Sequence, residues 1–186
     1  ASHPYAANLS ENAMRACRAC GIPYIRYERQ SVPLDYAKAH YVADYEEAAE
    51  VAASLGKNIF LTTGSHNLKV FKEAPALQDC VLTARVLPDP TVVAECAALG
   101  FRPSHIVALQ GPFSEVLNEE LYKKYEADVV VTKNGGTVGG ADTKFAAAMK
   151  LGLPLVIVER PRIAYEHMAQ NFEEVLEFIY QKRKDK

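Results

Sequence analysis

Three short polar segments of the chain combine glycine with hydroxyl, amide or amine side chains, and each follows an apolar segment. They are residues 62–67, 110–114 and 133–140, and Lys144 lies just beyond the third. Glycine lets a ligand approach the backbone closely, and free amides at the start of a helix attract anions. These residue types therefore favour a carboxylate or a phosphate as the ligand.

The candidate binding residues are those whose side chains or backbone amides could meet such an anion. They are Thr63, Gly64, Ser65, Gly111, Ser114, Lys133, Asn134, Gly136 and Lys144. The 133–140 segment matches neither the Walker pattern nor GxGxxG, so a plain tight turn explains its glycines as well as an anion site does. If Lys133 meets a charged group, its replacement by alanine should weaken binding by roughly 1–3 kcal/mol.

The elements that carry these segments alternate in type. Helices, among them residues 45–55 and an Ala-rich helix with Lys144, are expected between a very short strand at residues 41–42 and apolar strands at residues 58–62, 81–87, 106–109, 129–131 and 155–158. This alternation predicts an α/β fold with a parallel or mostly parallel sheet covered on both faces. All strand-to-helix turns of such a sheet lie at one edge, so the three polar segments can meet one ligand.

The start of the chain departs from this alternation. A helix opens the chain without a strand before it, and residues 23–28 alternate as a strand would. We therefore expect residues 1–43 to be the remnant of a truncated first domain, and residues 44–186 to form a complete Rossmann-like domain with a parallel sheet. Tyr5 and His3 are weak candidates for a catalytic role, because they would follow the carboxyl end of the lost strand.

The chain is expected to end in a helix at residues 172–183. Its apolar residues recur at the spacing of a helix face that packs on a core. They are Phe172, Val175, Leu176 and Ile179. This helix is assigned to the second domain.

Composition narrows the class of partner. The 186 residues are 49% hydrophobic, and 21 basic and 23 acidic residues are mixed along the chain, for a formal net charge of -2. This balance offers no electrostatic attraction for nucleic acid or an anionic membrane surface. No apolar run reaches the roughly 20 residues of a membrane span and no signal peptide is visible, so a cytoplasmic protein is expected.

The cysteines do not form a metal-binding pattern. Cys17 and Cys20 are spaced as a CxxC, but no second CxxC and no nearby pair of histidines accompanies them. Both fall in an Ala-rich helical pattern, which favours small buried thiols. We expect no metal site.

Several motifs resemble those of precorrin-6A reductases, in the order and at the spacing of that family. The resemblance is carried by residues 3–6, 11–13, 21–24, 27–29, 61–68, 110–114, 132–136 and 158–161. It covers nearly the whole chain. Each motif is weak by itself, and their shared order makes the resemblance specific.

The resemblance implies two Rossmann-like domains and an NADPH-dependent reduction. The family transfers a hydride to one double bond of a tetrapyrrole, precorrin-6A or cobalt-precorrin-6A, in cobalamin synthesis. The acetate and propionate carboxylates of such a ring would suit a rim of amides, hydroxyls and lysines. The cofactor would supply the hydride, and the protein would hold it against the ring.

One departure from the family concerns the cofactor. The family begins with a strand and a Gly-rich turn that approaches the dinucleotide, and this chain lacks them. The resemblance therefore implies impaired NADPH binding and an enzyme that is inactive in this form. The exposed strand edge of residues 1–29 could pair with a second copy as a homodimer. Two alternatives stay open, a non-catalytic tetrapyrrole-binding module and a phosphate-binding α/β protein.

Overall fold

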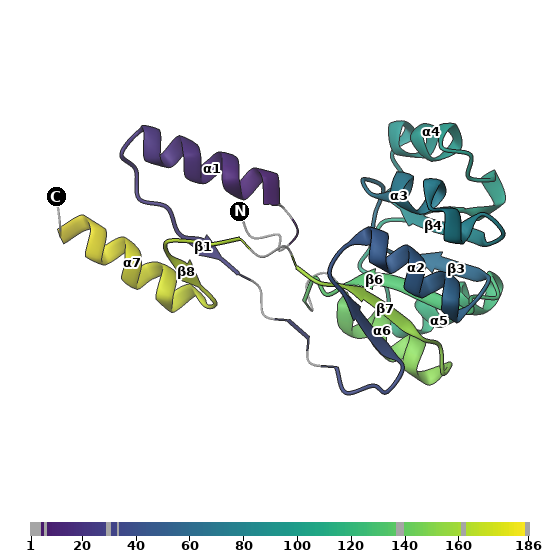
Figure 1. Cartoon of the computed structure of the whole chain (residues 1–186). Coiled ribbons are helices and arrows are strands. Elements are labelled where there is room, and N and C mark those ends of the chain that lie inside the picture. The colour runs from purple at the N-terminus through teal and green to yellow at the C-terminus, as the bar shows by residue number, and fades with distance from the viewer. Residues whose placement is uncertain are drawn as a thin grey trace. The chain divides into compact units, whose positions relative to one another are not determined.

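The chain divides into two compact units in a computed structural model that describes residues 5, 7–28, 31–32, 34–136, 140–160 and 163–184 (Figure 1). Unit 1 combines Ala1–Ser31 with Arg160–Lys186, and unit 2 is Val32–Glu159. This division differs from the boundary expected between residues 43 and 44. The chain returns to unit 1 because β8 (Met168–Ala169) pairs in parallel with β1 (Arg26–Tyr27).

Unit 2 contains a six-stranded sheet in the order β2-β7-β6-β3-β4-β5. The strands are β2 (Ala39–Val42), β3 (Asn58–Leu61), β4 (Val81–Val86), β5 (Ile106–Ala108), β6 (Val129–Lys133) and β7 (Leu155–Val158). Every neighbouring pair is parallel. The expected α/β fold with a parallel sheet is therefore confirmed.

The helices of unit 2 cover both faces of this sheet. They are α2 (Tyr45–Leu55), α3 (Leu68–Glu73), α4 (Pro90–Ala98), α5 (Glu115–Lys124) and α6 (Ala141–Lys150), with 3-10 turns at Pro75–Leu77 and Pro103–His105. Side chains of α2, α3 and α4 share one core with Val129 and Val131 of β6. Those of α5 and α6 share the opposite core with Val130. Burial on both faces explains why the central strands are apolar without interruption.

Local caps fix where the helices begin. The Asp44 carboxylate accepts the N–H of Glu47 at 2.8 Å and starts α2. The Ser114 hydroxyl accepts the N–H of Leu117 at 3.1 Å and starts α5. Each cap satisfies a donor that would otherwise lack a partner at the helix start. The two caps lie in the turns after β2 and β5, at the carboxyl edge of the sheet.

Unit 1 contains α1 (Ala7–Ala19), β1, β8 and α7 (Phe172–Lys184). The Arg26 side chain is completely buried, and its Nε donates to Oε2 of Glu28 at 2.9 Å. Helix α7 belongs to unit 1, which corrects its assignment to the second domain. Its expected core face is also largely exposed, since Phe172 and Leu176 are 71% and 51% accessible.

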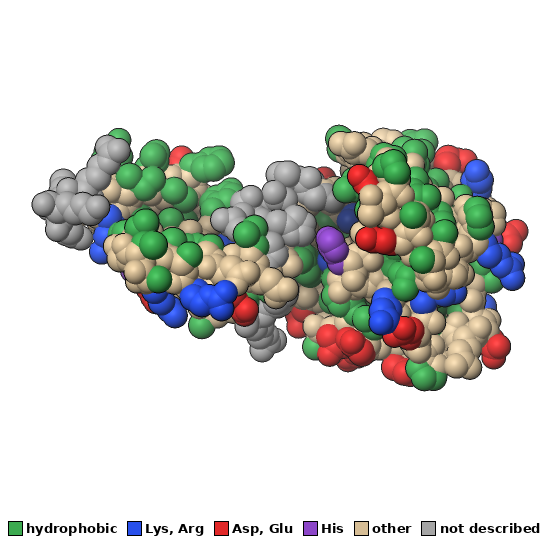
Figure 2. All heavy atoms as spheres, turned by 90° about the horizontal axis from the view of Figure 1, so that it is seen from above, with side chains coloured by type: hydrophobic (Ala, Val, Ile, Leu, Met, Phe, Trp, Pro, Cys, Tyr) green, Lys and Arg blue, Asp and Glu red, His purple; other side chains and the backbone are tan. Residues whose placement is uncertain are grey.

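Figure 2 shows hydrophobic side chains on the visible surfaces of both units, with acidic and basic side chains among them. The expectation of buried thiols in α1 is also corrected. Cys20 is exposed, because the helix ends at Ala19, and Cys17 is only half-buried.

Candidate functional site

A pocket of about 450 Å³ lies at the carboxyl edge of the unit 2 sheet. Its lining comes from the turns after β3 and β5, from the end of β4 and from the start of α6. The lining residues that matter most are Thr62, Gly64, Arg85, Gly111, Phe113 and Lys144. None of the described residues that line it is Asp or Glu. The pocket thus combines cationic and apolar groups without an acidic group.

The strand order places this pocket at a change in the direction of winding. The chain runs outward from β3 through β4 to β5, and then crosses to β6 on the other side of β3. Parallel α/β sheets bind ligands at the carboxyl ends of the strands beside such a point. Thr62 and Gly64 after β3, and Gly140 at the start of α6, line the pocket there.

Arg85 is a buried cation at the end of β4. It is 7% exposed, and its Nη1 donates to Oδ1 of Asn118 at 2.6 Å. The guanidinium also lies 4.2 Å from the centroid of the Phe113 ring, within the range of a cation–π contact. Burial lowers the pKa of Arg85, but an arginine remains charged in proteins. Its charge is therefore held in place by two neutral groups.

Lys144 is a second buried cation, in the second turn of α6. It is 7% exposed, and no hydrogen bond or ion pair of its ammonium is found among the described residues. Burial, followed by the positive charges of Arg85 and Lys133, lowers the pKa of Lys144 to about 7. Burial also lowers the pKa of Lys133 at the end of β6. An anion in the pocket would relieve this repulsion.

The structure brings only some of the candidate residues to the pocket. Gly64, Gly111 and Lys144 line it. Thr63 lies beside it and is 2% exposed, with a buried hydroxyl for which no hydrogen-bond partner is found in the described structure. The carbonyl of Ser65 accepts the N–H of Leu68 at the start of α3. These residues all follow strands at the same edge.

The other candidates have structural contacts that explain their residue types. Ser114 caps α5, as described above. Asn134 donates to the carbonyl of Val32 at 2.9 Å and accepts the Val32 N–H at 3.1 Å, so it ties a distant segment to the turn after β6. Gly136 has φ of +78°, a backbone conformation that glycine adopts at no steric cost. Whether these residues also meet a ligand stays a prediction.

The two weak catalytic candidates precede α1 in the sequence. Tyr5 is half-buried in a turn before α1, and His3 lies outside the described residues. The candidates expected from the sequence do not include Arg85, Asn118 or Phe113. Arg85 is the only charged residue of the strand segment Val81–Val86, and this was the available signal.

Comparisons with known proteins agree with the motif resemblance. A sequence model of the family described as precorrin-6x reductase CbiJ/CobK matches residues 1–180. The chain belongs to this family. A solved structure described as CobK precorrin-6A reductase matches with a TM-score of 0.76 and 28% identity, over 97% of this chain and 71% of that one. The suspected family and the fold class are therefore confirmed.

Two curated relatives of the precorrin-6x reductase family have the same printed name. The cobalt-precorrin-6A reductase of Priestia megaterium is 46% identical over 177 residues, which is 95% of this chain and 69% of the relative. That of Methanothermobacter thermautotrophicus is 40% identical over 169 residues, which is 89% of this chain and 55% of the relative. The chain therefore spans only part of the length of these reductases.

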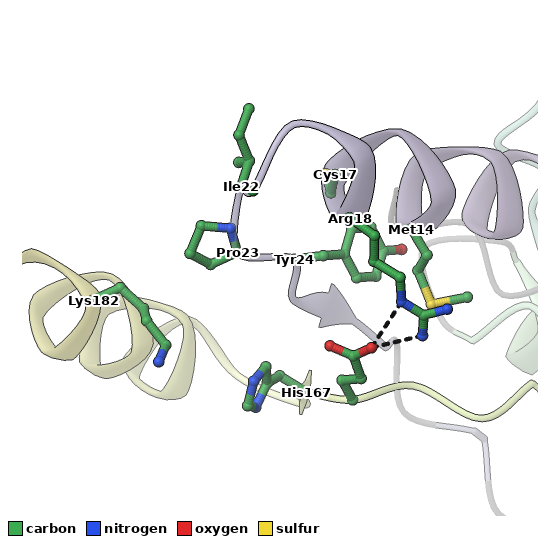
Figure 3. A pocket seen from close by; sticks show the side chains of 10 residues that line it. Met14, Cys17, Arg18, Ile22, Pro23, Tyr24, His167 and Lys182 are labelled. Atoms are coloured by element: carbon green, nitrogen blue, oxygen red, sulfur yellow. Dashed lines mark hydrogen bonds and ion pairs between the residues drawn. The ribbon is translucent and has the colours of Figure 1, made fainter. Parts of the chain in front are cut away.

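This family member has a second pocket, of about 280 Å³, within unit 1 (Figure 3). Arg18 and Glu166 both line it, and Nη2 of Arg18 lies 2.6 Å from Oε1 of Glu166. Tyr24 also lines it, with a buried hydroxyl that has no partner in the described structure. Because the Arg18 cation already has a carboxylate partner, this pocket attracts an anionic ligand less than the pocket of unit 2 does.

Neither a metal site nor a membrane-spanning helix is found among the described residues. Over residues 5, 7–28, 31–32, 34–136, 140–160 and 163–184, no group of three or more His, Cys, Asp or Glu side chains could hold a metal ion. Within the same ranges, no helix has the length and apolar character needed to traverse a bilayer.

Proposed function

We propose that this member of the precorrin-6x reductase family acts in cobalamin synthesis and reduces one double bond of precorrin-6A or cobalt-precorrin-6A, with NADPH as the hydride donor. The observation that carries the proposal is the pocket at the carboxyl edge of the unit 2 sheet. Its buried cations, Arg85 and Lys144, lack a carboxylate partner among the described residues. A tetrapyrrole with acetate and propionate side chains supplies such carboxylates.

The pocket fits a carboxylate-bearing ring better than it fits the ribose of a dinucleotide. Ribose hydroxyls are commonly bound by an Asp or Glu in Rossmann folds, and the described lining of this pocket contains neither. The lining instead pairs cations with apolar groups such as Leu87, Leu109 and Phe113. These groups match a ring that is apolar on its faces and anionic at its periphery.

The chain's own part in the reaction is binding and orientation. NADPH supplies a hydride when bound, and a proton is then needed on the neighbouring carbon. Fixing the carboxylates of the ring holds one face toward the hydride donor and lowers the entropic part of the barrier. The candidates for this role are Thr63, Gly64, Ser65, Gly111, Ser114, Lys133, Asn134, Gly136 and Lys144.

A turnover assay tests this function. The chain is mixed without oxygen with cobalt-precorrin-6A and NADPH, and the absorbances of NADPH and of the ring are followed together. We expect NADPH absorbance to fall in proportion to the reduced ring, and to fall more slowly for this chain than for a full-length relative, because the resemblance implies impaired NADPH binding in this chain. A full-length relative is assayed in parallel as the positive control. The proposal would be refuted if the chain showed no turnover and also did not bind the ring.

Phosphate binding is the second candidate function of this chain. It is favoured by the same cations, because Arg and Lys also bind phosphate, and by the Gly-rich turn before α6. Binding of inorganic phosphate without any affinity for the tetrapyrrole would support it. Binding of the ring without reduction would instead indicate a non-catalytic tetrapyrrole-binding module.

A further inference from the structure

The buried guanidinium of Arg85 has no carboxylate partner among the described residues of unit 2. Its described partners are the Asn118 amide oxygen, at 2.6 Å, and the Phe113 ring. A buried charge is costly unless an opposite charge meets it. No Asp or Glu is among the described residues that line the pocket beside it. An anionic ligand is the missing partner that this arrangement indicates.

The contacts of Asn118 orient this guanidinium. Asn118 is completely buried on α5, and its Nδ2 donates to the Ser114 carbonyl at 2.9 Å. That bond turns Oδ1 of Asn118 toward Arg85. Phe113 stacks against the guanidinium and limits its rotation. Both contacts leave the remaining N–H groups of the guanidinium available to a ligand that enters the pocket, because an arginine has five such donors.

Lys144 provides an independent second observation. It lines the same pocket from α6, is more than nine-tenths buried, and has no ion-pair or hydrogen-bond partner among the described residues. The ionisable groups that act on these two cations are Lys133 of β6, Asp142 of α6 and Tyr122 of α5. Among them only Asp142 is an acid, and its effect on Lys144 is the smallest. Two cations thus face one pocket without a sufficient counter-charge.

We propose that Arg85 and Lys144 form a two-point receptor for oxyanions, in which Arg85 recognises a carboxylate of the tetrapyrrole and Asn118 and Phe113 act as positioning residues. This assignment rests on the proposed function. The planar guanidinium can donate two parallel hydrogen bonds to one carboxylate, whereas the lysine acts as a point charge. Arg85 therefore sets the orientation of the ring, and Lys144 adds attraction.

The phosphate of a dinucleotide has the same oxyanion chemistry, so the experiment uses two probes. Uroporphyrin is a stable tetrapyrrole with acetate and propionate groups, and inorganic pyrophosphate represents the dinucleotide. Binding of each to the whole chain is measured by calorimetry for the wild type, Arg85→Gln and Asn118→Asp. The Asn118→Asp change gives Arg85 an internal carboxylate that competes with the ligand. Lys57→Gln removes one exposed charge before β3 and is the matched control.

We expect Arg85→Gln and Asn118→Asp each to weaken uroporphyrin binding by about 10- to 100-fold, and Lys57→Gln to leave it unchanged. Thermal unfolding verifies that each variant is folded. Equal affinities of the wild type and both variants, or no binding of either probe by the wild type, would overturn the receptor. Arg85-dependent binding of pyrophosphate alone would support an oxyanion receptor but overturn the tetrapyrrole as its source.

Proton uptake gives a readout that a purely structural role would not change. An anion beside Lys144 stabilises its ammonium, so binding near neutral pH should take up a fraction of a proton. The apparent binding enthalpy of the wild type should then depend on the ionisation enthalpy of the buffer, and that of Lys144→Met should not. Uroporphyrin is not the proposed substrate, so its binding does not depend on turnover. A chain that binds uroporphyrin through Arg85 but shows no turnover would refute the reductase proposal and leave the oxyanion receptor standing.

Discussion

Lys144 is a residue of the candidate binding pocket whose burial lowers the free energy of unfolding. Its ammonium is buried beside Arg85 and Lys133, and burial is the main cause that lowers its pKa to about 7. A group whose charged form is disfavoured in the folded state reduces the free energy of unfolding wherever the unfolded chain would be protonated. Strained or unpaired groups of this kind gather at functional sites.

We expect Lys144→Met to raise the free energy of unfolding, because methionine keeps most of the volume and removes the desolvated charge. A lowering of the pKa from 10.5 to about 7 corresponds to on the order of 5 kcal/mol when the amine is protonated in both states. Urea unfolding in buffers without phosphate, at about pH 6, measures the gain. Lys57→Met, at an exposed position, is the control and should change little.

The sign of the pH dependence provides a second check on Lys144. Between the folded pKa of about 7 and the ordinary lysine value, the unfolded chain binds more protons than the folded one. The wild type therefore gains stability as the pH rises through this window. The advantage of Lys144→Met should be largest below about pH 7 and shrink toward about pH 10. An advantage that is constant with pH would contradict the assigned cause.

At the scale of elements, one carboxylate connects two central strands. The Asp128 carboxylate, just before β6, accepts the N–H groups of Lys57 and Asn58 at 2.8 Å each, at the start of β3. Gly56 fits against the same side chain, because a Cβ there would collide with Asp128. The pair β3–β6 carries the turns that meet at the pocket, so its register decides which residues meet there.

We expect Asp128→Ala to lower the free energy of unfolding by about 1–2 kcal/mol, since two backbone donors lose a charged acceptor at an exposed site. Chemical unfolding measures the change. Asp79→Ala removes an exposed aspartate without a described partner and should have no measurable effect. A similar effect of both substitutions would show that net charge, and not the bonds to β3, is responsible.

The sequence predicted the bounds of an element best where a capping residue or an uninterrupted apolar run marked both of its ends. The bounds 45–55 and 155–158 coincide with α2 and β7, since Asp44 caps the helix and four consecutive apolar residues form the strand. The four-residue strand β2 was expected to be shorter, because its residues pair with a partner more than a hundred positions away. The two-residue strand β8 exists only through its pairing with β1. Such pairings have no local signal.

The sequence predicted which edge of the sheet carries the pocket, but it did not predict the buried charge of Arg85 there. Glycines and polar residues after apolar strands indicated where the turns meet, and Gly64, Gly111 and Lys144 do line one pocket. Arg85 lies inside an apolar strand, where its side chain could have faced solvent or the core. Its role depends on Asn118, which lies 33 positions further along the chain. Only the packing of α5 against β4 reveals that pair.

At the scale of the whole molecule, unit 1 depends on a buried ionic network. Oε2 of Glu28 accepts from Nε of Arg26 at 2.9 Å, and Oε1 accepts from Arg160 at 3.2 Å. Arg26 is completely buried, so its charge needs this partner. The same unit contains only two-residue strands in the described structure, and its apolar side chains are widely exposed. We therefore expect it to unfold before unit 2.

We expect Glu28→Gln to destabilise unit 1 by about 3–5 kcal/mol, because it removes a carboxylate that pairs with the buried Arg26. Hydrogen exchange measures each unit separately. The N–H groups of Arg26 and Glu28, which bond to the β8 segment, should lose protection, whereas those of Val130 and Leu155 in unit 2 should keep it. Glu166→Gln breaks the exposed pair with Arg18 and should cost less than about 1 kcal/mol. Equal loss of protection in both units would show that they unfold together.

The exposed face of α7 bears on the predicted homodimer. Phe172, Leu176, Ile179 and Tyr180 are 71%, 51%, 41% and 61% accessible, and their spacing places them on one side of the helix. Contiguous apolar surface of this kind marks an interaction site or a tendency to associate. The Tyr27 ring stacks on Phe172 with centroids 5.2 Å apart and so holds the face at its first residue. A second copy of the chain could cover the rest.

We expect the chain to associate reversibly as its concentration rises, and Leu176→Lys to keep it monomeric, because a lysine in the middle of an apolar contact must lose its hydration. Sedimentation equilibrium measures the mass. Gln181→Lys adds the same charge on the opposite side of α7, where residue 181 is exposed, and should leave association unchanged. Suppression by both variants would point to net charge as the cause, and a wild type that is monomeric at every concentration would show that this face does not mediate a dimer.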